Sequence, residues 1–584
     1  MYCPQCGTRI EDDYRFCPEC GVKIQRDMAE NAGNASESVT TENNHAPESA
    51  NQEQSLSVMA RGLILTNLQT LSNRLKTDKK IIQSIIDKYI AELKSLGLSY
   101  KLIDASDYTY SRSSFGIHKH VSLNSYSPWY DYADLLLDQH ENEHSQGLPE
   151  SEYVFIIGGN RDVPMPTLLN FNSAKYSKNE PDYTMDTDLL YSYPFGQKME
   201  QELLSQKIFY YDALFYVGRL PIADDATIAD LTNYLDRNTN LKCTIPFGRA
   251  YTQCASSWKN VTNAITNPLL KHGLYYDLSG IIDESKLFDK HILISPPVAV
   301  ARENMLHEEF DTEAGYIFFN MHGASQKHLP FYFGDEGYIG FSPALMSYCE
   351  RPNIVFTQAC YGGKFIGLPK NSSMMLTSLS TKTMSFVGSS RIAWGAVDGG
   401  RLSASDILAM SFNTHAIEGE SVGAAFFTAR MDTFKSNPGH PTTALTICEF
   451  NLYGDPMLHI GVENPIFQIS KSAPLKQGDK LNVPKEEILM NKSASAQSMS
   501  MLSQLRHAVD SNIMKIHEII SKQLYEQYNI QAREPLIITR RTYPDGTKEL
   551  AYDYQLANVT EGVNSIASVT TNESGEISSV ITSK

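Results

Sequence analysis

The sequence of 584 residues lacks the long hydrophobic runs that membrane-spanning helices require. A spanning helix needs about 20 consecutive apolar residues, whereas the strongest apolar runs here, such as residues 153–157, have the length of β-strands. The first residues, MYCPQC, also lack the basic and apolar regions of a secretory signal peptide. We therefore expect no membrane span and a cytoplasmic location.

The sequence also has too little positive charge for a large nucleic-acid surface. It contains 50 Lys and Arg against 67 Asp and Glu, which gives a formal net charge of −17, whereas nucleic-acid-binding surfaces are basic. Apolar residues make up 42% of the chain, as in globular proteins, and the length predicts several domains. Any contact with nucleic acid would therefore have to be local.

Cysteine is scarce and unevenly distributed, which argues against a disulfide framework. Of the nine cysteines, four lie in CPQCG and FCPECG near the N-terminus: Cys3, Cys6, Cys17 and Cys20. Two C-x2-C pairs can place four thiolates in a tetrahedron around one Zn²⁺, and a closed site with four cysteine ligands leaves no position open for catalysis. The pattern predicts a zinc ribbon with one structural zinc ion. A redox-active CxxC pair is the alternative.

Changes in composition divide the chain into six segments. The segment after the zinc ribbon is rich in Asn, Ser and Glu and has too few large apolar residues to order itself. The expected segments are a zinc ribbon (1–26), a disordered linker (27–56), an N-terminal α/β subdomain (57–245), a second α/β subdomain (246–465), a linker (466–495) and a C-terminal helix with antiparallel strands (496–584).

Short apolar runs that end in glycine or polar residues alternate with helical stretches through both central segments. The runs cover residues 153–159, 213–222, 316–323, 353–360 and 385–390, and the clearest helical stretches cover 79–97 and 226–238. This alternation predicts a largely parallel sheet flanked by helices, with functional residues at the carboxyl ends of the strands.

The C-terminal segment has a different pattern. A helix around residues 498–528 precedes two hairpins that turn at residues 544–546 and 573–575. This order predicts a small α+β module with a structural or interaction role.

Two of the predicted strands end in residues that could perform nucleophilic catalysis. One run ends in FNMHG, with His322 and Gly323, and another ends in FTQACYGG, with Cys360. A cysteine nucleophile needs a histidine for proton transfer and N–H donors for the oxyanion. If the two strands are parallel neighbours, His322 and Cys360 lie on one edge of the sheet. The backbone N–H groups of Gly323 and Cys360 would then form the oxyanion hole. An isolated buried cysteine or histidine is more often structural.

The motifs and their order resemble those of gingipain-type cysteine peptidases, which are relatives of caspases. The resemblance covers residues 60–465 and rests on VFIIGGNRDVP, FYVGRLPI, the FNMHG and FTQACYGG pair, and NLYGDPMLHI. It implies a caspase-like α/β fold in which residues 246–465 are catalytic. Cys360 would attack the peptide carbonyl and His322 would protonate the leaving amine. The family also places an acidic residue beside the histidine, for which Glu180, Asp182 and Asp186 are candidates.

The resemblance further implies cleavage after Arg or Lys. Asp188, in MDTDLLYSYPFGQK, falls where the family has an aspartate that pairs with the basic side chain of the substrate. Trp394, in GSSRIAWGA, falls where the family has a tryptophan lining the same pocket. A solvated loop acid and a core tryptophan are the respective alternatives.

Two other interpretations remain in view. HENEH, with His140 and His144, spells the zinc-binding pattern H-E-x-x-H, but we expect it in a loop, where it would not support zinc hydrolase chemistry.

The whole chain is expected to act in limited, regulatory proteolysis, with the ribbon or the C-terminal module recruiting substrate or restraining the peptidase. The alternative is a catalytically silent caspase-like scaffold that binds protein partners through its zinc ribbon.

Overall fold

The computed structural model describes most of the chain after residue 58. The described residues are 59–114, 117–295, 310–325, 329–335, 337–397, 399–461, 475, 481–492, 511–528, 530–532, 534–556 and 565–584. The predicted zinc ribbon and the linker that follows it lie outside these residues, as does most of the linker at 466–495.

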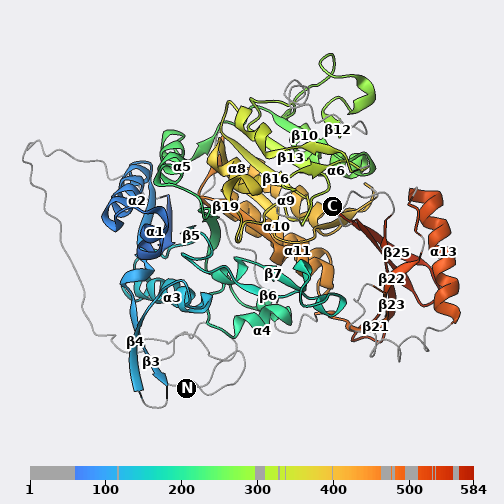
Figure 1. Cartoon of the computed structure of the whole chain (residues 1–584), viewed down its shortest axis with the longest axis horizontal. Helices are drawn as coiled ribbons and strands as arrows, with labels where there is room; N and C mark the ends of the chain where they lie inside the picture. The colour runs from blue at the N-terminus through green and yellow to red at the C-terminus, as the bar shows by residue number, and fades with distance from the viewer. Residues whose placement is uncertain are drawn as a thin grey trace, which may run out of the picture.

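A sheet of 11 strands forms the centre of the described part of the molecule (Figure 1). All neighbouring pairs are parallel except two, one at an edge and one at the centre. The order is β11 (Leu287–Phe288), β12 (Ile292–Ile294), β10 (Ala250–Cys254), β13 (Tyr316–Asn320), β16 (Asn353–Thr357), β17 (Thr383–Ser389), β19 (Phe450–Gly454), β8 (Tyr216–Leu220), β5 (Tyr153–Ile157), β1 (Ala60–Thr66) and β2 (Leu98–Asp104). The antiparallel pairs are β11–β12 and β17–β19.

The central strands are buried on both faces, which explains why their sequences are mostly apolar and do not alternate with polar residues. Every residue of β5, β8, β13, β16, β17 and β19 is buried. A sheet covered on both faces needs no alternation of apolar and polar residues. The prediction of a largely parallel α/β sheet is therefore confirmed. The sheet runs through both predicted subdomains, because β19 lies between β17 and β8, and the boundary at residue 245 stays a prediction.

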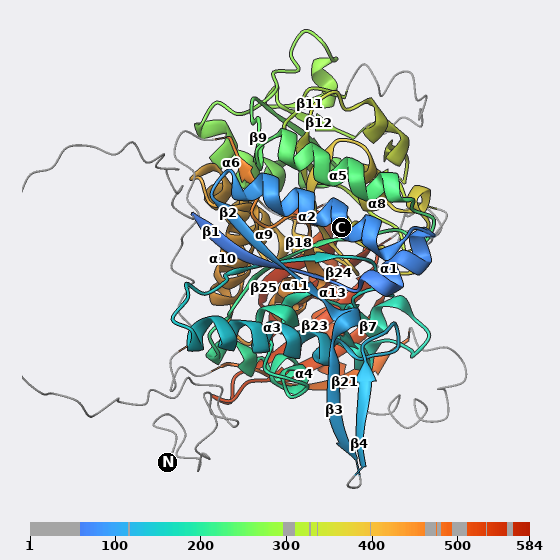
Figure 2. The ribbon, with the colours of Figure 1, turned by 90° about the vertical axis from the view of Figure 1, so that its left-hand side faces the viewer.

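Helices pack against this sheet and against one another. Figure 2 shows α2 (Lys79–Lys94) lying alongside α5 (Ile228–Asn240), and α5 also contacts α8 (Met374–Ser380). Elsewhere, α9 (Ser405–Ile417) packs against both α6 (Lys259–Lys271) and α10 (Val422–Ser436). The helix expected at 79–97 is α2, which begins after its capping residue Asp78 and buries Ile82, Ile86 and Leu93. Three further helices are α1 (Leu68–Leu75), α4 (Met199–Leu204) and α11 (Pro441–Glu449).

The prediction that HENEH lies in a loop is wrong. His140 and His144 belong to the helix α3 (Trp129–Ser145). The first turns of α3 bury apolar residues, and His140 is buried further along the same helix. The carboxylate of Glu150 lies 3.6 Å from His140 Nε2 and 2.6 Å from His144 Nδ1. Within the described ranges, no group of three or more His, Cys, Asp or Glu side chains could hold a metal ion.

The C-terminal module adds a second sheet of six strands. Its order is β18 (Trp394–Ala396), β25 (Ile577–Ser583), β24 (Ile566–Asn572), β23 (Lys548–Gln555), β22 (Pro535–Thr542) and β21 (Lys485–Asn491). Helix α13 (Ser511–Tyr528) buries Ile516, Ile520 and Leu524 against this sheet. The two expected hairpins are confirmed, and so is the expected helix from residue 511 onwards, whereas its predicted start at 498–510 lies outside the described residues. Strand β18, however, comes from the large α/β body, so the module docks by strand pairing and residue 584 lies near the centre of the molecule (Figure 1).

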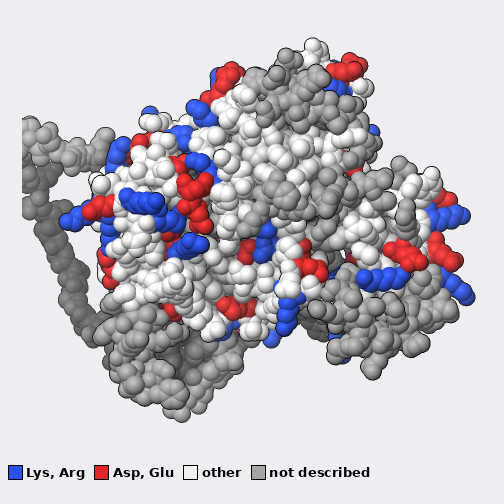
Figure 3. Space-filling model, viewed as in Figure 1, with Lys and Arg blue, Asp and Glu red and all other residues white. Residues whose placement is uncertain are grey.

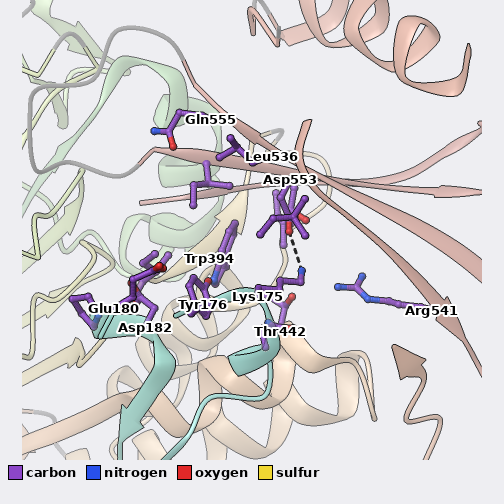
Figure 4. A pocket seen from close by; sticks show the side chains of 17 residues that line it. Lys175, Tyr176, Glu180, Asp182, Trp394, Thr442, Leu536, Arg541, Asp553 and Gln555 are labelled. Atoms are coloured by element: carbon purple, nitrogen blue, oxygen red, sulfur yellow. Dashed lines mark hydrogen bonds and ion pairs between the residues drawn. The ribbon is translucent and has the colours of Figure 1, made fainter. Parts of the chain in front are cut away.

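A buried ion pair and a cavity mark the junction between module and body. Lys175 Nζ lies 2.9 Å from Asp553 Oδ2, and each of these side chains is only 8% exposed. Figure 4 shows this pair beside a cavity lined by Trp394 and Asp182. The cavity has a volume of about 260 Å³, and Ile581 of β25 also lines it. The two parts therefore meet through desolvated charges as well as through backbone hydrogen bonds.

From the sequence we expected neither a membrane-spanning helix nor a large basic surface. Within the described part of the chain, no helix combines the length and the apolar character needed to cross a membrane. On the face that Figure 3 shows, Lys and Arg side chains are interspersed with Asp and Glu rather than gathered in one basic patch.

The contact between α9 and α10 contains a histidine whose charge depends on pH. His415 Nε2 lies 3.2 Å from Asp432 Oδ2, and its Nδ1 lies 2.9 Å from Glu420 Oε1. These hydrogen bonds, with Asp432 contributing most, raise the pKa of His415 from 6.5 to about 10. A pKa raised in the folded state gives stabilisation that is fully present below about pH 6.5 and is lost as the pH rises through about 10.

We therefore expect His415→Gln to lower the free energy of unfolding by about 1–2 kcal/mol at pH 6, because a partly exposed ion pair is screened by solvent. The difference from the wild type should shrink at pH 10. Urea unfolding at both pH values measures it, with His272→Gln at an exposed position as the control. An equal difference at the two pH values would contradict this role for the charge.

Candidate active site

Parallel pairing of β13 and β16 brings the two catalytic candidates to one edge of the sheet. Phe319 of β13 is in register with Thr357 of β16, so both strands end at the same level. A Cβ atom added to Gly323 would lie 1.9 Å from the carbonyl oxygen of Cys360, so the residue after His322 contacts the backbone of Cys360 directly. Glycine is thus required at position 323 by the backbone of Cys360, whereas the sequence alone indicated only that His322 and Cys360 could be close.

The turn after Cys360 is held by hydrogen bonds and by a left-handed residue. Tyr361 has φ 58°, its N–H donates to Arg391 O at 2.8 Å, and its hydroxyl donates to the buried carboxylate of Asp182. At Gly363, a Cβ atom would approach Gly388 O to 2.5 Å. Tyr361, whose role the sequence left open, therefore anchors the turn that presents the cysteine.

Cys360 itself is buried, with 3% of its surface exposed. Its thiol donates a weak hydrogen bond to Ala393 O, with a sulfur–oxygen distance of 3.8 Å. Burial raises the pKa of the Cys360 thiol well above 9, and the hydrogen bond to Ala393 offsets only part of this increase. The thiol is therefore neutral in the structure, and forming a thiolate requires a proton acceptor.

His322 is held between an acid and an aromatic ring. Its Nε2 lies 3.5 Å from Asp335 Oδ1, and its ring centroid lies 4.4 Å from that of Trp258. Burial alone would raise the pKa of Asp335, but the hydrogen bond and charge of His322 outweigh it, so this pKa is lowered. An ionised acid beside an imidazole orients the ring and stabilises its protonated form.

Asp335 was not among the acids considered from the sequence. Asp182 is bonded to Tyr361, Asp186 Oδ2 lies 2.8 Å from Arg391 Nη1, and Glu180 accepts from Ser177 N. The missed signal is the glycine–aspartate turn GDEG, which begins at Gly334, 11 residues after the end of FNMHG. It follows β14 (Tyr332–Phe333), and Phe333 exchanges backbone hydrogen bonds of 3.0 and 2.9 Å with His322.

The structure does not leave Asp188 available for a basic substrate. Arg219, from β8, donates to both oxygens of its carboxylate at 2.7 Å, and both side chains are buried. The guanidinium of Arg219 is fully desolvated, so its burial in the core requires the negative charge of Asp188 beside it. The assignment of Asp188 to the specificity pocket is therefore corrected, and its place is a core ion pair.

The backbone of Trp394 lies next to the site, but its side chain does not contribute to the site. It is paired with Ser583 of β25, and its side chain lines the cavity beside the module (Figure 4). It is 7% exposed. Near Cys360, the structure instead places Trp258 and Asp406 around a basic group.

That basic group is Lys584, the last residue of the sequence. The backbone N–H of Cys360 donates to the main-chain oxygen of Lys584 at 2.8 Å, and Lys584 N–H donates to Ala393 O at 3.0 Å. Its Nζ lies 2.6 Å from Asp406 Oδ1 and 5.1 Å from the ring centroid of Trp258. Burial lowers the pKa of Lys584, and Asp406 opposes that change. The side chains of this lysine and of Asp406 are both 0% exposed.

Asp406, at the start of α9, is tied directly to the cysteine motif. Gln358, two residues before Cys360, donates its amide to Asp406 Oδ1 at 2.9 Å. Asp406 Oδ2 accepts from the backbone N–H groups of Ala396 at 2.6 Å and Ser403 at 3.3 Å. Little in the sequence indicates this role, because Asp406 lies far along the chain from Cys360 and its spacing matches no short motif.

Comparisons with known proteins agree with the motifs. The family model described as "Peptidase family C25" matches residues 89–461, and the model described as "zinc-ribbon domain" matches residues 2–23, which include all four cysteines of the predicted ribbon. No curated protein matches the chain.

Several solved structures are similar to the chain. The Arg-specific cysteine proteinase gingipain R (RgpB) is 12% identical, with 89% of this chain and 98% of that chain covered and a TM-score of 0.43. A complex of the Porphyromonas gingivalis RgpB pro- and mature domains is 13% identical, with 88% and 98% covered and a TM-score of 0.44. The separase–securin complex of Saccharomyces cerevisiae is 12% identical, with 56% and 17% covered and a TM-score of 0.27.

The C25 model covers well over half of the sequence and includes every motif from FYVGRLPI to NLYGDPMLHI. The family is that of the gingipain-type peptidases to which the motifs pointed. The chain belongs to peptidase family C25 and is a cysteine peptidase.

Proposed function

We propose that this peptidase is an endopeptidase that cleaves protein substrates after Lys or Arg with Cys360 as nucleophile and His322 as general acid and base. The observation that carries the proposal is the backbone N–H of Cys360, which points at a main-chain oxygen 2.8 Å away. An oxyanion donor has to occupy this position relative to the carbonyl under attack. His322, oriented by Asp335, stands on the same edge of the sheet.

The proposed reaction begins with transfer of the thiol proton from Cys360 to His322. Burial disfavours the thiolate, so the transfer is coupled to substrate binding and to the charge of Asp335. The sulfur attacks the peptide carbonyl, and the carbonyl oxygen takes the electron pair and accepts hydrogen bonds from Cys360 N–H and Gly323 N–H. The C–N bond then breaks as His322 protonates the leaving amine. His322 next takes a proton from water, which attacks the thioester. The C–S bond breaks, the acid product leaves, and His322 returns the proton to the sulfur of Cys360.

Basic specificity is supported by the buried Asp406 and its lysine partner. A buried carboxylate rejects neutral side chains, because it would remain desolvated without a counter-charge. Limited proteolysis is supported by the position of Lys584, whose main-chain oxygen accepts the backbone N–H of Cys360, since a site that is already occupied admits few substrates. We therefore assign the chain a regulatory rather than a digestive role.

Substitutions in the proposed catalytic residues should separate chemistry from binding. Cys360→Ala should abolish cleavage of Lys-containing peptides, and His322→Ala should lower kcat by roughly 1,000-fold or more. Asp335→Asn should lower kcat by about 10- to 100-fold with little change in KM, because it removes the charge that stabilises the imidazolium. Steady-state kinetics on a fluorogenic lysyl peptide measure all three.

Asp277→Asn, at an exposed position away from the site, is the matched control for Asp335→Asn. Persistent cleavage by Cys360→Ala would show that the nucleophile is misassigned. If the chain neither cleaves such peptides nor reacts with a thiol-directed lysyl electrophile under any activating condition, it is a silent scaffold and not an active peptidase.

We also propose that Cys3, Cys6, Cys17 and Cys20 bind one structural Zn²⁺. Support comes from the zinc-ribbon model that spans these residues and from the donor set, because four thiolates favour tetrahedral zinc. A closed site of this kind has no catalytic position, so the ribbon would recruit a protein substrate or partner. It lies outside the proposed catalytic machinery.

The purified chain should contain one zinc ion, measured by atomic absorption, and Cys3→Ser with Cys6→Ser should remove it. Cys349→Ser, which changes a buried thiol outside the ribbon, should keep it. The double variant should retain its kcat on small lysyl peptides, since the ribbon supplies no catalytic group. Zinc retained in the double variant would refute the assigned ligands.

A further inference from the structure

We propose that the chain fills its own substrate cleft: strand β25 and Lys584 bind as a substrate-like peptide, and Asp406 is the acid that receives the lysine. The inference rests on the proposed function, since the cleft is defined by Cys360. It also says how the C-terminal module would restrain the peptidase, which the sequence suggested only as one of several roles for the ribbon or the module.

The backbone of β25 is bound as peptidases bind substrates, by addition of a strand. β25 pairs antiparallel with β18, with Ser583 opposite Trp394 and Thr582 opposite Gly395. Lys584 N–H continues this ladder by donating to Ala393 O at 3.0 Å. Main-chain hydrogen bonds of this type supply affinity, and side-chain pockets supply specificity.

The position of the Lys584 oxygen fixes the register of this bound strand. It accepts the backbone N–H of Cys360 at 2.8 Å, which is the contact proposed for the carbonyl under attack. Lys584 therefore stands where the residue on the amino side of the cleaved bond would stand in a substrate. Thr582, two residues earlier, accepts a hydrogen bond of 3.2 Å from Trp258 Nε1.

The lysine pocket is closely fitted to its occupant. A Cβ atom on Gly395 would lie 2.1 Å from Lys584 Cε and 2.6 Å from Asp406 Oδ1, so only glycine leaves room for this side chain. The ring of Trp258 adds a cation–π contact to the ammonium group. The pocket is thus built around a long basic side chain.

The hydrogen bonds of Asp406 favour lysine over arginine. Its Oδ2 is occupied by the N–H groups of Ala396 and Ser403, so a substrate cation meets Oδ1. A single ammonium group fits this arrangement, whereas a guanidinium binds most strongly when both carboxylate oxygens are available. We therefore expect the cleft to prefer lysine before the cleaved bond.

Release of the cleft is coupled to docking of the module. β25 is paired on its other side with β24, so the strand belongs to the module's own sheet. Separation of β25 from β18 would also disturb the nearby contact between Lys175 and Asp553. A binding partner that pulls the module away from the body would therefore open the cleft, and a free lysyl peptide would have to compete with a tethered one.

The first test uses activity. Lys584→Ala and Lys584→Gln should raise kcat/KM by roughly 10-fold or more on a fluorogenic peptide with the residues ITSK before the leaving group, and should speed labelling by a lysyl electrophile equally. Lys548→Ala, which removes an exposed lysine from the same sheet, is the control and should match the wild type. Asp406→Asn and Gly395→Ala should both lose cleavage after lysine. Equal kcat/KM in the wild type and both Lys584 variants would overturn self-occupancy.

The second test does not depend on catalysis. In a Cys360→Ala background, a labelled peptide of sequence ISSVITSK should bind roughly 10-fold or more tightly when Lys584→Gln is also present, measured by fluorescence anisotropy. The same peptide should raise the Tm of that double variant and leave the Tm of Cys360→Ala unchanged. Equal binding to the two proteins would refute self-occupancy. Tighter binding without cleavage by any Lys584 variant would support self-occupancy and refute the proposed peptidase function.

Discussion

The site depends on the parallel register of β13 with β16. Once Phe319 is level with Thr357, the residues that follow each strand meet at one edge, and only a glycine at position 323 lets the two backbones approach. His322 and Cys360 lie at this edge because of the pairing. The buried apolar core on both faces of the sheet holds the register, so the geometry of the site is a property of the whole body and not of one loop.

The sequence predicted the parts of the fold and site that are written in local patterns. The apolar strands, the helix at 79–97, the two C-terminal hairpins and the cysteine motif all carry short-range signals, and the family was evident from them. The partners of those motifs were predicted poorly. Asp335 and Asp406 approach His322 and Cys360 only through tertiary contacts, and Asp188 was assigned to the wrong role because its partner Arg219 could not be identified from the sequence. The cytoplasmic location and the zinc ion stay predictions.

Buried charges are concentrated where separate parts of the chain join. Arg219 with Asp188 connects β8 to the segment before it, Lys175 with Asp553 connects the body to the module, and Lys584 with Asp406 connects the last strand to the cleft. Breaking such a pair by removing one partner costs about 3–5 kcal/mol, whereas an apolar contact tolerates many substitutes. These pairs therefore specify which surfaces meet, even where they add little net stability.

Strand β25 is at once part of a folded sheet and a ligand of the cleft, and this dual role has a consequence for inhibitor discovery. A reversible inhibitor binds only the fraction of molecules in which the strand has left β18, so its apparent Kd is weakened by that fraction. Screens on the intact chain would thus rank compounds partly by how well they displace the strand. Compounds that instead occupy the cavity of about 260 Å³ between body and module could change that fraction without touching the cysteine (Figure 4).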